Sequence, residues 1–288
     1  MMNLNKNKIS KPDWLKIRLP DTAEYNWMYK TIKNNDLHTI CTSGRCPNAA
    51  ECWSNGTATF IILGDICTRS CKFCGVKTGI PQQVDFKEPL RIARSIKIMN
   101  LKNAVVTSVS RDDLPDFGAS IWAETILKIK ELNPNTTIEV LIPDFNGKYK
   151  LIQQVIDAKP EVINHNLETV RRLTPFIRTK AKYETGLSVL KYIADSGITA
   201  KSGIMLGLGE TETEVLETMN DLLTIGVKVF TLGQYLQPTT KNIVVSEYIT
   251  PEKFKFYEEE GLKRGFKFVE SSPLVRSSYR AEKIVVSG

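Results

Sequence analysis

The chain has 288 residues, of which 42% are hydrophobic, so it is long enough to bury the core of one large α/β domain. No apolar run approaches the roughly 18 residues that span a bilayer, and the lysine-rich residues 1–11 lack the apolar stretch of a secretory signal. We therefore expect a cytoplasmic protein with no membrane partner. The net charge of +7 admits nucleic acid, but acidic residues are interspersed with the basic ones and no basic tract stands out, so we predict no nucleic-acid partner.

Residues 1–56 predict an arm that precedes the main fold. A capping-box pattern at residues 21–24 follows Pro20 and indicates the start of a helix. Apolar residues then recur at the spacing of one helix face, from Tyr25 to Ile32. The polar residues 34–36 end this helix, and a loop that carries three cysteines follows.

From residue 57 onward, a short apolar strand, a polar turn and a helical stretch recur in six successive units. The strands are predicted at residues 59–63, 104–109, 138–142, 162–166, 200–206 and 229–235. Helices are predicted between and after them, for example at residues 88–99, 119–132, 182–194, 213–225 and 251–264. This alternation predicts a parallel sheet with crossover helices.

We therefore expect a partial (β/α)6 TIM-type barrel over residues 57–265, with a doubly wound open sheet as the alternative. The N-terminal arm, residues 1–56, and a C-terminal tail, residues 266–288, would flank the barrel; the tail begins with a short apolar run at residues 266–269. Because barrels of this kind carry their chemistry at the C-terminal ends of the strands, polar residues at those ends predict a substrate pocket. These residues are Ser108, Arg111, Asp112, Asp113, Asp144, Asn164, His165, Asn166, Glu168, Gln234 and Gln237.

Three cysteines with the spacing C-x3-C-x2-C follow the first predicted strand: Cys67, Cys71 and Cys74. All six cysteines of the chain lie between residues 41 and 74, and this clustering without an export signal favours metal ligation over disulfides. Three thiolates can hold three irons of a [4Fe–4S] cube and leave the fourth iron open to a small molecule. Structural zinc takes four protein ligands, and clusters that only transfer electrons usually have a fourth cysteine. Buried or zinc-bound cysteines are the alternative interpretation.

The second set of cysteines has the spacing C-x4-C-x5-C: Cys41, Cys46 and Cys52. No seventh cysteine is present to complete a four-cysteine site. A zinc site that combines these three thiols with His38 is the alternative to a second iron–sulfur cluster.

The C-x3-C-x2-C spacing resembles the radical S-adenosylmethionine (SAM) superfamily, in which the amino and carboxylate groups of SAM chelate the open iron. The second spacing, together with residues 276–279 (Arg-Ser-Ser-Tyr), resembles the lipoyl synthase family. Further matching segments bring the resemblance to about residues 11–281; they are residues 45–48, 51–53, 58–64, 107–113, 141–145, 164–169, 201–211 and 233–238.

The resemblance implies that two sulfur atoms are inserted at C6 and C8 of an octanoyl chain carried on a lysine of another protein. Those carbons are unactivated, so a radical is required, and the cofactors supply it. A [4Fe–4S] cluster on Cys67, Cys71 and Cys74 would reduce SAM to methionine and a 5′-deoxyadenosyl radical. A second, auxiliary [4Fe–4S] cluster on Cys41, Cys46 and Cys52 would be the sulfur source. Its fourth ligand would be Ser278, with Ser277 as the neighbouring alternative, and Arg276 would offset its charge.

The resemblance also leads to a hypothesis for the SAM pocket. Phe73, Gly207 and Leu208 would flank the adenine, Asn166 or Glu168 would hold the ribose, and Ser108 or Arg178 would meet the methionyl group. In the alternative interpretation the glycines only shape a strand end, Arg178 is a surface cation and His165 is an interior histidine. Partners implied by the family are an octanoylated lipoyl carrier domain or glycine-cleavage H protein, an electron donor such as ferredoxin or flavodoxin, and an iron–sulfur cluster carrier protein.

The chain departs from the family pattern at Thr42–Gly44 of the auxiliary segment, at Asn242, where a histidine is common, and at Gly186, where a serine is usual. None of these departures removes a ligand. Three rival functions follow from the residues: another two-cluster radical SAM enzyme, a metal-stabilised nucleic-acid binder, and an electron-transfer relative that does not cleave SAM.

Overall fold

The fold is built around a parallel sheet of seven strands in the order β1-β4-β5-β6-β7-β8-β9, in a computed structural model that describes residues 10–16, 23–34, 39, 41, 46 and 48–281. Each strand pairs with the next strand of the sheet along the chain, always in parallel. The strands are β1 (Thr57–Ile62), β4 (Asn103–Ser108), β5 (Thr137–Leu141), β6 (Val162–Asn164), β7 (Thr199–Leu206), β8 (Val229–Gln234) and β9 (Phe268–Ser272). A doubly wound sheet would reverse its strand order, so the sequential order confirms the partial barrel over the alternative.

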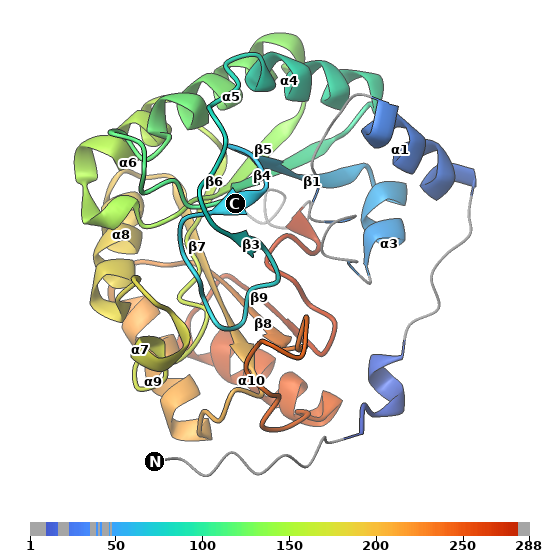
Figure 1. The fold of residues 1–288 in the computed structure, drawn as a ribbon. Coiled ribbons are helices and arrows are strands. Elements are labelled where there is room, and N and C mark those ends of the chain that lie inside the picture. The colour runs from blue at the N-terminus through green and yellow to red at the C-terminus, as the bar shows by residue number, and fades with distance from the viewer. Residues whose placement is uncertain are drawn as a thin grey trace.

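Helices cover the outer face of the curled sheet, as Figure 1 shows for the arc from α4 through α10. They are α4 (Glu88–Ile98), α5 (Ala119–Leu132), α6 (Tyr149–Asp157), α7 (Thr174–Ile177), α8 (Tyr183–Asp195), α9 (Glu212–Thr224) and α10 (Pro251–Arg264). Outside this arc lie α1 (Ala23–Asn34), α3 (Ala49–Ser54), two 3-10 turns at Asp13–Leu15 and Phe145–Gly147, and a two-stranded ribbon of β2 (Ile66–Cys67) and β3 (Lys77–Thr78). Within the described part of the chain, no helix is both long and apolar enough to cross a membrane.

Local sequence signals explain where most of these elements begin and end. All six side chains of β1 are buried, as expected for a strand of a parallel sheet that is covered on both faces. Helix α9 starts at a capping box in which the Thr211 side chain accepts a hydrogen bond from Glu214 N–H. Helix α10 starts after Thr250, whose hydroxyl accepts from Lys253 N–H, and stops at Gly265, where φ is +119°. The predicted box at residues 21–24 lies largely outside the described residues.

The sheet contains one strand more than the six that the sequence predicted. Strand β9 pairs with β8 over Phe268–Ser272, where the sequence indicated only a short apolar run at the start of the tail. Its burial alternates along the strand, since it lies at an edge of the sheet and packs with one face only. The tail that leaves the barrel therefore begins after Ser272.

The barrel is not closed by hydrogen bonds between β1 and β9, and segments from both ends of the described chain lie at this open side. The residues after β9 run beside α3, as Figure 1 shows for the red segment next to α3. Asn48 donates its side-chain amide to the Leu274 carbonyl at 2.7 Å, and the Tyr279 hydroxyl lies 2.9 Å from the Glu51 carboxylate. These contacts join the segment of the second cysteine set to the C-terminal tail.

Gly233→Ala is expected to loosen this tail. A Cβ atom at Gly233 would lie 2.2 Å from the Val275 carbonyl oxygen, and backbone cannot move aside as a flexible side chain can. We expect a destabilisation of about 1–3 kcal/mol in urea unfolding, with faster proteolysis after Ser272. Gly79→Ala is the control, because its Cβ would meet only the Ile66 side chain at 3.5 Å. Equal proteolysis of the two variants would contradict the expectation.

Candidate active site

The first cysteine set lies on one loop over the C-terminal ends of the strands. Cys67 ends β2, and its sulfur accepts backbone N–H groups from Arg69 at 3.4 Å and Ser110 at 3.3 Å. The pKa of Cys74 is raised to about 11, mainly by burial and also by the charges of Cys71 and Cys67. The three thiols therefore lie close enough to repel one another as anions, which places them around a common region.

Three unpaired thiols on one loop suit a cluster with several metal atoms. Among the described residues, no three Cys, His, Asp or Glu side chains converge as the ligands of a single metal ion would. A [4Fe–4S] cube binds each thiolate at a different iron, so its ligand sulfurs need not converge on one point. Backbone N–H groups directed at a sulfur are also common around such clusters, where they stabilise its charge.

The second cysteine set lies beside β1. The pKa of Cys41 is raised to about 11, mainly by burial; the charge of Cys46 adds to the rise, and hydrogen bonds with Thr59 oppose it. Cys46 donates its backbone N–H to the Cys41 carbonyl at 3.1 Å, and Cys52 follows in α3. No disulfide joins any of the six cysteines. His38 of the zinc alternative and residues 42–45 lie outside the described residues.

Arg276 brings the C-terminal tail to this second set. Burial lowers the pKa of its guanidinium, while the charge of the Cys46 thiol raises it, so the two groups are neighbours. The guanidinium also donates to the Val275 carbonyl at 2.7 Å. Ser277 and Ser278 follow in a turn and are both half-buried. A cationic side chain is thus already in place where the auxiliary cluster is predicted.

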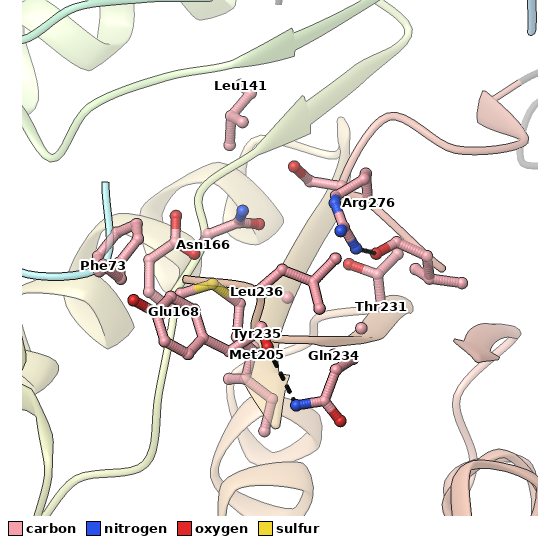
Figure 2. A pocket seen from close by; sticks show the side chains of 15 residues that line it. Phe73, Leu141, Asn166, Glu168, Met205, Thr231, Gln234, Tyr235, Leu236 and Arg276 are labelled. Carbon is pink, nitrogen blue, oxygen red and sulfur yellow. Dashed lines mark hydrogen bonds between the residues drawn. The ribbon is translucent and has the colours of Figure 1, made fainter. Parts of the chain in front are cut away.

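A cavity of about 250 Å³ lies between Phe73 of the first cysteine loop and Arg276, the neighbour of Cys46. Figure 2 shows Phe73 of the cluster loop on one side of it and Arg276 of the tail on the other, with Asn166 and Glu168 near Phe73. The rest of its lining comes from β5, β7, β8 and the tail; it comprises Leu141, Gly203, Ile204, Met205, Thr231, Gly233, Gln234, Tyr235, Leu236, Val275 and Ser277. The cavity mixes apolar and polar side chains, as a pocket for an amphiphilic ligand requires.

Three of the residues predicted to bind SAM line this cavity: Phe73, Asn166 and Glu168. Arg178 donates to the carbonyls of Asn166 at 3.0 Å and Leu167 at 3.3 Å, so it is not an isolated surface cation. Asn166 Oδ1, Arg178 Nε and Ser108 Oγ are all buried without a hydrogen-bond partner among the described residues. Because buried polar atoms are normally paired, Asn166 Oδ1 at the cavity wall fits a polar ligand, whereas Ser108 and Arg178 are not among the residues that line the cavity.

Gly207 and Leu208 do not line the cavity. Their backbone N–H groups both donate to the Glu210 carboxylate, and a Cβ at Gly207 would lie 2.2 Å from Gln234 Nε2. With φ at +95°, Gly207 is required by this turn, which favours the alternative that it shapes a strand end. Their contact with adenine stays a prediction without support from the geometry.

Glu168 has an uncommon backbone conformation for a residue with a side chain, with φ at +70°. Its N–H donates to the Gly203 carbonyl at 3.0 Å and its carbonyl accepts from Met205 N–H at 2.9 Å, which holds it beside β7. Burial raises the pKa of the carboxyl, while Arg178 and a hydrogen bond with Asn166 lower it. Strained residues of this kind cluster at functional sites, and no local sequence pattern reveals them.

Several polar residues predicted to line the pocket have other partners. Asp112 and Asp144 pair with Arg69, which the sequence analysis did not single out, and Asp113 pairs with Arg111. His165 is an interior histidine, since Nδ1 lies 2.9 Å from the Ile142 carbonyl oxygen and burial lowers its pKa to about 4. Sequence reasoning missed the cavity-lining residues Met205 and Thr231. Both lie in apolar strands, and an apolar pattern does not show which residues of a strand face the cavity.

Asn242 and Gly186 both depart from the family pattern, but Asn242 contacts the first cysteine loop and Gly186 packs away from the cavity. Asn242 donates its amide to the carbonyls of Lys72 at 3.1 Å and Cys74 at 2.9 Å, so it holds the cluster loop. Gly186 packs under Leu167, where a Cβ would approach to 2.7 Å, and has no contact with the cavity.

Residues 61–222 match the family described as the radical SAM superfamily. The chain is 61% identical over 275 residues to the lipoyl synthase of Parabacteroides distasonis, an alignment that covers 96% of this chain and 98% of the relative. It is 60% identical over 277 residues to the lipoyl synthase of Treponema denticola, with 96% of each chain covered.

Two solved structures share the fold at low sequence identity. Streptococcus suis SuiB bound to S-adenosylmethionine has a TM-score of 0.59 at 12% identity, over 88% of this chain and 58% of that chain. Methylornithine synthase has a TM-score of 0.55 at 12% identity, over 89% of this chain and 86% of that chain. These likenesses support the partial barrel.

Proposed function

Because this chain belongs to the lipoyl synthase family of the radical SAM superfamily, we propose that it inserts two sulfur atoms, at C6 and C8, into an octanoyl chain bound to a carrier protein. One observation carries the proposal beyond the family name. A single cavity is walled on one side by Phe73 of the first cysteine loop and on the other by Arg276, the neighbour of Cys46. A substrate held there lies between both cysteine sets.

In this proposal each cysteine set holds one [4Fe–4S] cluster. Cys67, Cys71 and Cys74 hold the cluster that binds SAM, and Cys41, Cys46 and Cys52 hold the auxiliary cluster, with Ser278 as its fourth ligand and Ser277 as the alternative. When bound, the first cluster with SAM supplies hydrogen-atom abstraction from an unactivated carbon, and the second supplies sulfur. The arm, residues 1–56, and the tail after Ser272 then serve the auxiliary cluster, and the barrel, which begins at residue 57 and includes β9, serves SAM.

The chain's own residues bind and orient the substrates, and they exclude water. Glu168 and Asn166 accept hydrogen bonds from the ribose hydroxyls. Arg178 Nε and Ser108 Oγ, both buried without a hydrogen-bond partner among the described residues, interact with the methionyl group. Apolar side chains from several strands leave little room for water around the reacting carbons and suit an alkyl chain; they are Leu141, Ile204, Met205 and Leu236.

The chemistry defines the partners by class. The octanoyl chain arrives on a lipoyl carrier domain or a glycine-cleavage H protein, and the net charge of +7 suits an acidic carrier. An electron donor such as ferredoxin or flavodoxin supplies the reducing equivalent, and an iron–sulfur carrier protein rebuilds the auxiliary cluster. Six thiols at two clusters suit a reducing cytosol.

Anaerobic reconstitution followed by a single-turnover assay tests the proposal. We expect about eight irons per chain, and formation of 5′-deoxyadenosine and a dithiolane-bearing peptide from SAM, dithionite and an octanoyl-lysine peptide. About four irons with SAM cleavage but no sulfur product would indicate another radical SAM reaction. Zinc without iron would contradict the proposal.

Glu168→Gln is expected to weaken SAM binding about 10- to 100-fold, since it removes charge-assisted hydrogen bonds to the ribose. The wild-type affinity should fall as the pH is lowered, because protonation removes the accepting carboxylate. Burial raises the pKa of Glu168, so this loss should begin at a higher pH than for an ordinary glutamate. Titrations of SAM at several pH values, with the exposed Glu217→Gln as control, measure both effects. A pH-dependent affinity in Glu168→Gln equal to that of wild type would remove this assignment.

A further inference from the structure

Arg69 lies between two cysteines of the cluster loop, and its guanidinium is fully engaged by two aspartates from other loops. Nε and Nη2 donate to the Asp112 carboxylate at 2.9 and 2.8 Å. Nη1 and Nη2 meet the two oxygens of Asp144 at 2.9 and 2.8 Å. The side chains of Arg69, Asp112 and Asp144 are only 6%, 11% and 4% exposed. This double fork joins the loop after β1 to the loops that follow β4 and β5.

Backbone contacts attach the same part of the loop to the residues after β4. The Thr68 N–H and hydroxyl both donate to the Ser110 carbonyl, at 3.0 and 2.9 Å, and the Thr68 hydroxyl accepts from Asp112 N–H at 3.1 Å. Ser110 N–H in turn donates to the sulfur of Cys67. The position of Cys67 is therefore fixed from the segment that also carries Asp112.

A second arginine holds the two ends of the cluster loop. Arg111 donates to the carbonyls of Leu63, at 3.2 Å, and Gln82, at 3.0 Å, and its fork pairs with Asp113. Of these contacts, only those of Arg69 cross from the cluster loop to the end of β5. Loss of Arg69 would remove the link from the loop to the end of β5, while Thr68 and Lys72 would keep their hydrogen bonds to Ser110 and Ile177.

Lysine cannot reproduce the Arg69 contacts. A guanidinium presents five donors in a flat fork that matches two carboxylates, whereas an ammonium donates from a single point. Burial alone would raise the pKa of Asp144, but Arg69 outweighs it and holds that pKa at about 2. Both aspartates therefore stay ionised at neutral pH. Without Arg69, Asp144 becomes a buried charge with too few partners, whereas Asp112 keeps its ion pair with Lys180 at 3.2 Å.

We propose that Arg69, clamped between Asp112 and Asp144, is a positioning residue that fixes the spacing of Cys67 and Cys71 for the SAM-binding cluster. The inference rests on the proposed function, in that these cysteines ligate that cluster. Replacing a residue that orients a metal ligand through hydrogen bonds changes metal affinity or activity by roughly 10- to 100-fold. The clamp also gives Asp112 and Asp144 a structural role that requires no contact with the substrate. Both lie in segments that carry the family resemblance, residues 107–113 and 141–145.

The test compares Arg69→Lys with wild type as reconstituted two-cluster protein. We expect iron to leave the SAM-binding cluster for a chelator about tenfold faster in the variant, with the auxiliary cluster released at the wild-type rate. The change in the EPR signal on addition of SAM identifies which cluster is lost. Arg171→Lys is the matched control, because Arg171 also meets two carboxylates, of Glu184 and Asp221, but is 53% exposed and far from any cysteine in sequence.

Release from both clusters at wild-type rates, with an unchanged SAM-induced EPR signal, would overturn the proposal. If Arg69→Lys does not fold, Asp144→Asn replaces it, since this variant keeps the Asp112 pair and the side-chain volume. Faster release confined to the SAM-responsive cluster would then support the clamp, and equal effects on both clusters would overturn it. A wild type without any SAM-responsive cluster would overturn the proposed function and the clamp together.

Discussion

Cys71→Ala is expected to abolish SAM cleavage while the auxiliary cluster stays in place. The remaining two thiols of the first set cannot hold a cube, and SAM then has no open iron to bind. We expect iron to fall from about eight to about four per chain, and 5′-deoxyadenosine formation to fall about 10³-fold or more. Iron analysis and a single-turnover assay with SAM and dithionite measure both changes.

Cys52→Ala is the matched control for this prediction. It removes one thiol of the second set and should likewise reduce the iron content to about four per chain. SAM cleavage should persist in this variant, and the dithiolane product should be absent. Cleavage at the wild-type rate in Cys71→Ala would show that the two sets have been assigned to the wrong clusters.

Ser278→Ala is expected to separate the two halves of the reaction. A serine oxygen on iron is a harder and more easily protonated ligand than a thiolate, so it suits a cluster that must give up sulfur. Its loss should lower dithiolane formation about 10- to 100-fold while 5′-deoxyadenosine still forms. Quantifying both products in one anaerobic turnover tests this separation.

Ser277→Ala decides between the neighbouring hydroxyls. Ser277 lines the cavity, and both serines are half-buried on the turn after Arg276. Loss of sulfur insertion in Ser277→Ala alone would move the ligand to that residue. Unchanged product yield in both single variants would mean that neither serine ligates the auxiliary cluster.

The regular part of the fold follows from local sequence patterns. The six predicted strands are confirmed, with their ends shifted by at most two residues, because buried parallel strands form continuous apolar runs. Helices α5 and α10 begin and end where the sequence predicted them. Strand β9 did not stand out, since Glu270 and the serines that follow it make a half-polar run that an edge strand tolerates.

The site is predictable only where its residues are adjacent in sequence. The cysteine spacing identified both candidate cluster segments, since a cube takes its thiols from one short loop. The Arg69 contacts join residues 43 and 75 positions apart, and their geometry depends on the tertiary fold. For the same reason, Asp112 and Asp144 read as free pocket carboxylates from sequence, although they are buried ion-pair partners.

The open side of the barrel determines the order in which the walls of the cavity form. Residues 273–281 follow every strand in chain order, so a ribosome synthesises them after the whole sheet, yet they supply Val275, Arg276 and Ser277 to the cavity wall. The barrel and its first cysteine loop can form during synthesis, because domains begin to fold as the chain emerges. The cavity gains the wall made by Val275, Arg276 and Ser277 only when the tail docks. A chain whose sheet has formed but whose residues 273–281 have not yet docked therefore lacks one wall of the cavity.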